Sequence, residues 1–228
     1  MKVCDKNKRP GKIKYTTVFL LFFFGSIAGF ILEGIWRIIT LGHWENHSAT
    51  VWGPFCIIYG IGAAVMYITA CFLNKKPLYL QYILYCFIGA AVEYVGSAVQ
   101  EIIFGSRSWD YSADVLNLNG RISLLMTLIW GLLGTVFIKV FFPFIVKSQE
   151  KLDEQGEHIK RLNRALCTSM TVFMIINLLV TSAAILRWSK RLEGEPPKNK
   201  FEISIDRYFD NEKMSEIFNN MTFVPKDK

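Results

Sequence analysis

The sequence predicts an all-α, polytopic membrane protein with about five transmembrane helices and a cytoplasmic N-terminus. Three observations lead to this fold class: an apolar composition, long apolar runs, and basic residues at every second junction between the runs. Apolar residues make up 52% of the 228 residues, a share that a soluble domain can also reach, so their distribution decides. Runs of about 20 residues or more cross about 30 Å of hydrocarbon at about 1.5 Å per residue. Such runs span residues 16–39, 51–73, 80–104, 122–146 and 167–186.

The basic residues, which give the chain a net charge of +7, lie mostly in the segments 1–14, 75–79 and 147–166. By the positive-inside rule these three segments are cytoplasmic, and segments 40–50 and 105–121 and the C-terminal tail lie on the other side. The charge follows the ends of the apolar runs and forms no patch typical of nucleic-acid binding. We therefore expect the lipid bilayer of the plasma membrane as the partner, and no nucleic acid.

The first run has two interpretations. A basic segment followed by an apolar stretch and the small residues Ser26-Ile27-Ala28 is also a feature of a cleavable signal peptide. We favour a membrane helix because the apolar run continues to Ile39.

One face of this first helix carries polar and small residues at successive steps of four, Gly25, Gly29, Glu33 and Arg37. The two glycines allow another helix to approach closely. Glu33 and Arg37 are spaced to form an ion pair, although Arg37 at the outer interface has the alternative of extending into water.

The second helix is expected to open at Gly53 and Pro54. The third places small and polar residues on one face, and the opposite face of isoleucine, valine and phenylalanine suits lipid. Glu93 lies near mid-membrane on the polar face, with Glu101 at its border. Because ionisable groups in hydrocarbon are costly, Glu93 is either a structural hydrogen-bonding group or a group that handles protons or cations. The polar face consists of Gly89, Glu93, Gly96, Ser97 and Gln100.

The remaining segments are assigned by composition. Segment 105–121 is rich in turn formers and interfacial aromatic residues, as expected of a loop at the membrane surface. The helices matching runs one to four form a membrane domain over 15–146, and the charged segment 147–166 is expected to contain a short helix on the cytoplasmic surface. A fifth helix is expected over 167–188. The region 189–228 reads as a linker and a tail that contains a strand and an amphipathic helix.

Combining topology with depth places most of the polar membrane residues in the outer half. We expect them to line an outward-facing polar pocket that binds a substrate. The loop residues His43, Glu45, His47 and Asp114 are interpreted as solvated. The predicted substrate contacts are Glu33, Arg37, Glu93, Glu101, Trp109, Asp110, Tyr111 and Arg121.

No recognised catalytic or metal-binding pattern occurs in the chain. There is no HExxH, no GxSxG and no GxxxxGK[ST], so we expect no metal and no cofactor, and any coupling to ATP requires a separate ATPase subunit. Whether the chain is an enzyme stays open on these grounds.

The chain resembles a family of small bacterial membrane proteins, the CmpB-like or type IV group of ABC-transporter permeases. The resemblance covers roughly residues 15–146 and departs at 46–50, where the family has Asn-Arg-Gly, and at Ile57, where it has proline. A cationic contact in that loop is therefore either absent or supplied by Arg107. The matching residues are Gly29 to Glu33, the Gly-Pro-Phe-Cys-Ile-Ile-Tyr-Gly of 53–60, Glu93-Tyr94, Trp109-Asp110-Tyr111-Ser112, Asn117, Asn119-Gly120-Arg121 and Trp130-Gly131.

Three functions are compatible with these features. The resemblance implies a transport subunit, and the excess of carboxylates favours a cationic or amine-bearing substrate. Its ATPase would dock on the charged cytoplasmic segment, at Lys151, Lys160, Arg161 and Arg164. The first alternative is a membrane-embedded enzyme acting on a lipid or lipid-linked substrate, with Glu93 or Asp110 as acid or base and Arg121 as an anion contact. The second is a scaffold or sensor. Since five helices are few for a complete path, a homodimer is expected.

Overall fold

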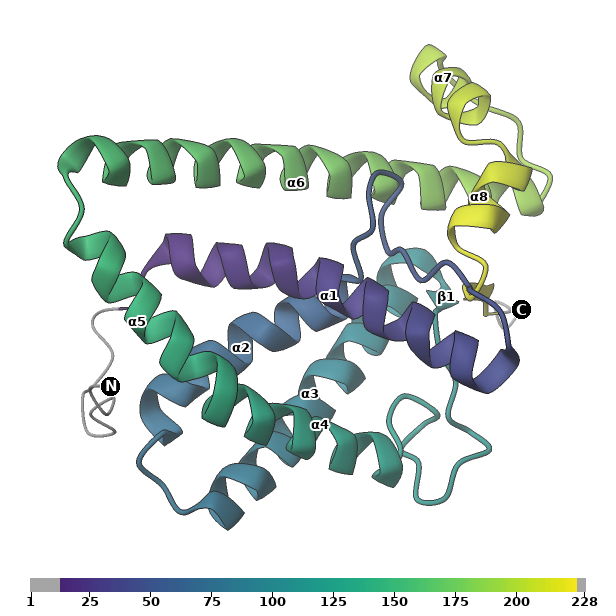
Figure 1. The fold of residues 1–228 in the computed structure, drawn as a ribbon. Coiled ribbons are helices and arrows are strands. Elements are labelled where there is room, and N and C mark those ends of the chain that lie inside the picture. Colours follow the sequence, from purple (N-terminus) through teal and green to yellow (C-terminus); the bar gives the residue numbers. More distant parts are fainter. Residues whose placement is uncertain (1–12, 225–228) are drawn as a thin grey trace.

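The computed structural model describes residues 13–224 (Figure 1). The predicted basic segment before Ile13 and the last four residues lie outside this range. Within it the chain is helical, as predicted, and the all-α polytopic architecture is confirmed. The elements are α1 (Tyr15–Leu41), α2 (Ile57–Leu73), α3 (Leu78–Phe104), β1 (Ser106–Arg107), α4 (Leu124–Val136), the π-helical turn η1 (Phe137–Phe141), α5 (Phe142–Asp153), α6 (Glu157–Leu192), α7 (Lys200–Tyr208), α8 (Asn211–Ile217) and β2 (Thr222–Phe223).

In the described range, four helical segments are long and apolar enough to cross a membrane: α1, α3, the continuous segment from α4 to α5, and α6. The second predicted helix is α2, a shorter apolar helix of 17 residues. It begins at Ile57, because residues 42–56 form an extended loop around Gly53, whose φ of 79° is left-handed. The helix therefore does not open at Gly53 and Pro54 as predicted, because the left-handed backbone at Gly53 does not fit a helix start.

The first four helices form two hairpins, α1 with α2 and α3 with α4, and small residues bring the partners together. In the first hairpin, a Cβ atom at Gly60 of α2 would overlap the Ser26 side chain of α1. In the second, one at Gly134 of α4 would overlap the ring of Tyr85 of α3. Small residues are the usual means by which membrane helices pack closely, because lipid supplies no hydrophobic drive between them.

The fourth apolar run continues further than predicted. Helix α4 passes through η1 into α5, where Pro143 occupies the first turn, and ends at Asp153. Proline lacks a backbone N–H, and a π turn before it relaxes the hydrogen-bond ladder. The predicted separate surface helix at 147–164 is wrong. Its first half extends α5, its second half begins α6, and only residues 154–156 separate them. Gly156, in an extended conformation, is the break.

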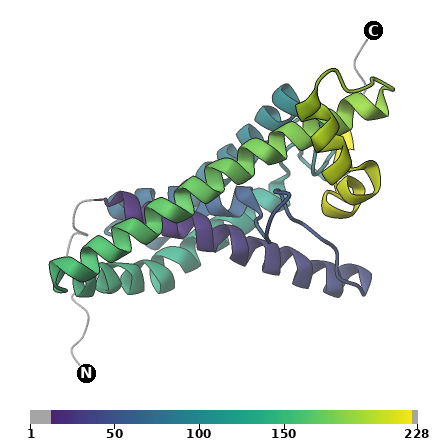
Figure 2. The same cartoon turned by 90° about the horizontal axis from the view of Figure 1, so that it is seen from above.

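Helix α6 runs obliquely across the others and spans the whole length of the molecule (Figures 1 and 2). It contains the predicted fifth run, 167–186, and extends it at both ends. Beyond it, the tail folds back as α7, α8 and β2. Arg187 of α6 is 4% exposed and donates two hydrogen bonds to Asp206 of α7, at 3.0 and 2.6 Å. The tail is therefore clamped to the end of α6.

The molecule has two distinct ends. The loop end gathers residues 42–56, 105–123 and 193–224, and there β2 pairs antiparallel with β1. The basic end gathers Lys14 and residues 74–77 and 154–156, and there Lys14 pairs with Asp153. The tail therefore lies at the same end as loops 42–56 and 105–123. The distribution of basic residues predicted that these segments share one side of the membrane. By the positive-inside rule we predict that the basic end is cytoplasmic.

Candidate functional site

A buried carboxylate lies at the centre of the second hairpin. Glu93 of α3 is 6% exposed, and its carboxylate accepts a hydrogen bond from the Tyr111 hydroxyl at 2.7 Å and from Trp130 Nε1 at 2.5 Å. Tyr111 belongs to the loop after β1, and Trp130 to α4. Burial raises the pKa of Tyr111, so its hydroxyl stays protonated and donates. The two donors satisfy an acid that would otherwise be costly in this environment.

A second carboxylate, in the first hairpin, has an equivalent partner. The Tyr59 hydroxyl of α2 donates to Glu33 Oε1 of α1 at 2.6 Å. The rings of Tyr59 and Trp130 lie 6.0 Å apart between centroids, so the two hairpins meet through these aromatic residues. Glu33 and Glu93 are close enough to interact electrostatically. We call these five side chains, Glu33, Tyr59, Glu93, Tyr111 and Trp130, the carboxylate centre.

The two hairpins build this centre in the same way. Each acid stands four residues after a glycine, Gly29 in α1 or Gly89 in α3, so the glycine and the acid share a helix face. A Cβ atom at Gly29 would overlap Tyr59, and one at Gly89 would overlap Trp130. The glycine therefore leaves room for the aromatic side chain that reaches the acid one turn further along.

Beside the carboxylate centre, toward the loop end, lies an ion-pair cluster of Ser97, Glu101, Arg107 and Arg121. Glu101 of α3 pairs with Arg107, and with Arg121 Nη2 at 2.9 Å. Arg121 Nη1 donates to Ser97 Oγ at 3.1 Å, and its guanidinium lies over the Tyr94 ring, 5.8 Å from the centroid. Glu101 with two arginines carries a net positive charge, in contrast to the acidic centre beside it.

Two of the predicted contacts organise the loop instead. Trp109 Nε1 donates to the backbone oxygen of Arg121 at 3.0 Å. Asp110 is exposed and accepts from the Ser112 backbone N–H at 2.9 Å and hydroxyl at 2.5 Å; these bonds hold the pKa of Asp110 below its usual value. Gly120, at φ 67°, lies against Asp110 and Ser112, where a side chain would overlap both. The loop around Tyr111 is thus internally braced.

The predicted pair of Glu33 and Arg37 gives way to other partners. Arg37 Nε lies 3.2 Å from Glu45 Oε2 and donates to His47 Nε2 at 3.1 Å. Arg37 thus contacts loop 42–56, whereas Arg107 pairs with Glu101. His47 is buried, which corrects the interpretation that it is solvated, and burial lowers its pKa. The Asn220 amide of the tail lies 3.3 Å from His47 Nδ1, so the tail joins this cluster.

The chemistry available at the carboxylate centre is that of two acids held by neutral donors. In the part of the chain that the structure describes, no three metal-binding side chains gather into a potential metal site. Carboxylates with aromatic neighbours favour cations, both by charge and through the negative faces of the rings. They also accept and release protons. The carboxylate centre can therefore either bind a cation or exchange a proton.

A comparison with protein families decides the relationship. The family model described as "Putative ABC-transporter type IV" matches residues 20–182, which include both hairpins and most of α6. The chain belongs to this family. No curated protein and no solved structure matches the chain. The type IV membership agrees with the predicted resemblance, and extends it beyond residue 146 into α6.

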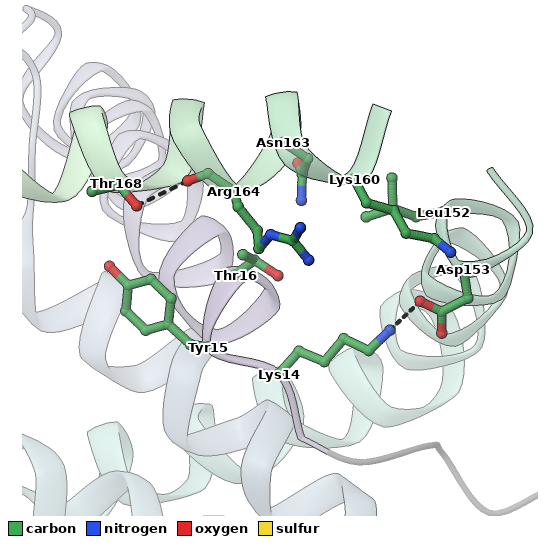
Figure 3. Close-up of a pocket in the computed structure, with 9 residues that line it drawn as sticks. All are labelled: Lys14, Tyr15, Thr16, Leu152, Asp153, Lys160, Asn163, Arg164 and Thr168. Atoms are coloured by element: carbon green, nitrogen blue, oxygen red, sulfur yellow. Dashed lines mark hydrogen bonds and ion pairs between the residues drawn. The ribbon is translucent and has the colours of Figure 1, made fainter. Parts of the chain in front are cut away.

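In this type IV protein the four basic residues predicted to dock a partner all lie near the basic end, but they differ in surroundings. Lys160 Nζ is 3.3 Å from Glu157 Oε1, and Arg164 Nη2 is 3.9 Å from Glu157 Oε2. Both line a cavity between the ends of α1, α5 and α6 (Figure 3). Lys151 and Arg161 are exposed and do not line it.

Of the three side chains that donate to the two acids in the type IV protein, the sequence predicted Tyr111 as a site residue and missed the other two. Tyr59 and Trp130 were not among the predicted site residues, although each directly precedes a glycine in the second helix of its hairpin. A usable signal was the recurrence of glycine four residues before an acid in the first helix, and of an aromatic residue before glycine in the second. The pairing itself depends on how the helices pack.

Proposed function

We propose that this type IV protein is a permease subunit of a membrane transporter, and that the carboxylate centre contacts the substrate on its path from the loop end. The observation that carries the proposal is Glu93, 6% exposed, with donors from α4 and from the loop at the outer surface. A buried acid in a membrane domain is costly, and it is normally retained for a function. The hydrogen bond from Tyr111 of loop 105–123 to Glu93 connects the membrane interior with the loop end.

The substrate class that fits best is a cation or an amine. Glu33 and Glu93 supply two carboxylates, and the rings of Tyr59 and Trp130 lie beside them. Positive charge is attracted both to carboxylates and to aromatic faces.

The energy source in this proposal is a separate ATPase, which docks at the basic end. The exposed Lys151 of α5 and Arg161 of α6 flank the sharp junction at 154–156, and these two side chains offer cationic contacts. We place the complex in the bacterial plasma membrane and propose two copies of the chain, because two hairpins and one further helix are few for a complete transport path.

The first experiment is affinity purification of the tagged protein at its native level in mild detergent, followed by mass spectrometry. Enrichment of an ATPase subunit supports the permease. If no ATPase co-purifies, and chemical crosslinking in intact membranes captures none, the ABC-type assignment is wrong.

The second experiment tests the site. Glu93→Gln keeps the size of the side chain and removes the charge, and we expect it to abolish uptake while membrane insertion stays normal. The matched control is Glu212→Gln, an exposed acid in the first turn of α8, which should transport normally. Normal uptake by Glu93→Gln would remove Glu93 from the substrate path.

A further inference from the structure

The basic end contains a cavity of about 430 Å³ between the first turn of α1, the last turn of α5 and the first turns of α6. Its lining combines apolar surface, to which Tyr15 and Leu152 contribute, with polar and cationic side chains around the opening: Lys14, Thr16, Lys160, Asn163 and Arg164 (Figure 3). It is separate from the carboxylate centre, which is built from the other halves of the helices. None of the features discussed so far requires a cavity in this position.

The charge of the lining is unbalanced. Lys14, Lys160 and Arg164 contribute three cations, against one lining carboxylate, Asp153, which pairs with Lys14. Lys160 and Arg164 share Glu157 at 3.3 and 3.9 Å, and the Glu157 side chain is 73% exposed. An ion pair with so exposed a partner is weak. Lys160 and Arg164 therefore keep most of their capacity to bind an anion.

The position of the cavity indicates which anion. It lies at the level where α1 leaves the basic end and where α6 changes from charged residues to the apolar residues that follow Arg164, with Leu166 and Val172 exposed. A molecule bound there has its polar part among lysine and arginine side chains and continues along apolar helix surfaces. That is the arrangement of a phospholipid at the cytoplasmic interface.

We propose that this cavity binds the phosphate-bearing headgroup of an anionic phospholipid from the leaflet at the basic end. Arg164 offers the planar guanidinium that matches phosphate oxygens, Lys160 offers a second charge, and the Thr16 hydroxyl and Asn163 amide offer neutral hydrogen bonds. The acyl chains extend along the exposed face of α6. Because the bound lipid touches α1, α5 and α6 together, it holds the start of α6 against the hairpins.

The proposal divides the four basic residues of the junction by function. Lys160 and Arg164 bind lipid, whereas Lys151 and Arg161 point elsewhere and stay available to a partner protein. It also supplies a matched control, since the double variants K160A/R164A and K151A/R161A each remove two cations from the same region. Alanine at exposed helical positions is compatible with folding, because it has the highest helix propensity.

The test uses the full-length protein purified in a neutral detergent. Binding of dioleoylphosphatidylglycerol and dioleoylphosphatidylcholine is measured by native mass spectrometry and by the shift in thermal unfolding temperature. Two further arms use inorganic phosphate and glycerol 3-phosphate. A basic residue near an anionic lipid strengthens binding roughly fivefold, so K160A/R164A should bind phosphatidylglycerol about 30-fold more weakly than wild type. The K151A/R161A variant should bind it within about threefold of wild type.

Each alternative outcome overturns the proposal. Equal binding of phosphatidylcholine and phosphatidylglycerol by wild-type protein means that the cavity does not recognise the anionic headgroup, and this comparison needs no variant. Stabilisation by inorganic phosphate or glycerol 3-phosphate equal to that by phosphatidylglycerol assigns the cavity to a soluble phosphate compound. Equal lipid loss in both double variants reduces the effect to general surface charge. If K160A/R164A loses a co-purifying ATPase and keeps the lipid, the residues belong to a protein interface.

Discussion

Replacing Trp130 with phenylalanine should uncouple α4 from the carboxylate of Glu93. The change keeps an aromatic ring and removes the indole Nε1–H, which donates to Glu93 at 2.5 Å. Glu93 then retains only the Tyr111 hydroxyl. Hydrogen bonds to charged groups contribute about 1.5–3 kcal/mol in soluble proteins. Interhelical ones in membranes average about 0.6 kcal/mol and reach about 1.7. For a bond to a carboxylate that is 6% exposed we expect a value near the top of the membrane range.

A double-mutant cycle isolates this contribution from the packing lost with the larger indole. The four proteins are wild type, Trp130→Phe, Glu93→Leu, which removes the acceptor, and the double variant, and the assay is reversible unfolding in mixed micelles of increasing denaturing detergent. We expect a coupling free energy of about 1 to 1.7 kcal/mol between the two positions. Trp52→Phe, at a tryptophan that is 42% exposed, serves as the control and should change stability by less than about 0.5 kcal/mol.

Additive effects of the two single changes would contradict a hydrogen bond between Trp130 and Glu93. A coupling free energy within about 0.3 kcal/mol of zero means that the indole and the carboxylate do not interact, whatever each variant costs alone. A large cost for Trp130→Phe with no coupling would mean that Trp130 stabilises the protein through packing. Its side chain lies against Gly62 and Gly89, where an added Cβ atom would overlap it.

Three further predictions concern close packing and the loop end. Gly89→Leu should prevent the second hairpin from closing and cost more than about 2 kcal/mol, seen as loss of monodisperse protein, whereas Gly156→Ala, which meets open space, should cost less than about 1 kcal/mol. Arg187 holds the pKa of Asp206 below its usual value. The tail should therefore stay docked above about pH 4 and become protease-sensitive as the pH falls further. The variant Arg187→Ala should release the tail at a higher pH. Burial lowers the pKa of His47. The contribution of neutral His47 to stability is therefore complete above about pH 6.5 and declines as the pH falls below that value. Between pH 7.5 and 5.5 the unfolding temperature of wild type should fall, and His47→Gln should remove this fall.

These three predictions have clear contrary results. Normal folding of Gly89→Leu would mean that α3 and α4 are less close than described. A tail released at the same pH with and without Arg187 would mean that other contacts hold it. An unfolding temperature of wild type that does not respond to pH between 7.5 and 5.5 would place His47 in water.

Much of the fold was predictable because membrane helices are specified by local composition. Apolar runs of sufficient length must cross the hydrocarbon as helices, since a lipid-exposed backbone has no other way to satisfy its hydrogen bonds. The positions of lysine and arginine then order the ends. The same reasoning placed Glu33 and Glu93 on polar helix faces, because a period of 3.6 residues assigns each residue to a face from the sequence alone.

The junction between α5 and α6 was mispredicted for a local reason. The residues of 147–164 are charged and compatible with a helix, so composition does not tell a surface helix from the ends of two longer helices. The break depends on Gly156 and on the short connection to α1 made by Lys14 and Asp153. The length of an apolar run is therefore a lower bound for the length of a membrane helix, because charged residues can continue the helix into the interface.

By itself, the sequence of this type IV protein determined that it is a helical membrane protein, which of its ends is basic, and which residues of α1 and α3 are acidic within the membrane. Only the tertiary structure decided that Tyr59 and Trp130 hold those acids, that Arg37 turns to His47, and that the tail closes over the loop end through β1 and β2. The physical reason is separation along the chain. Helix periodicity relates residues a few positions apart, whereas Glu93 and Trp130 are 37 positions apart, and they meet only where glycines let two helices pack closely.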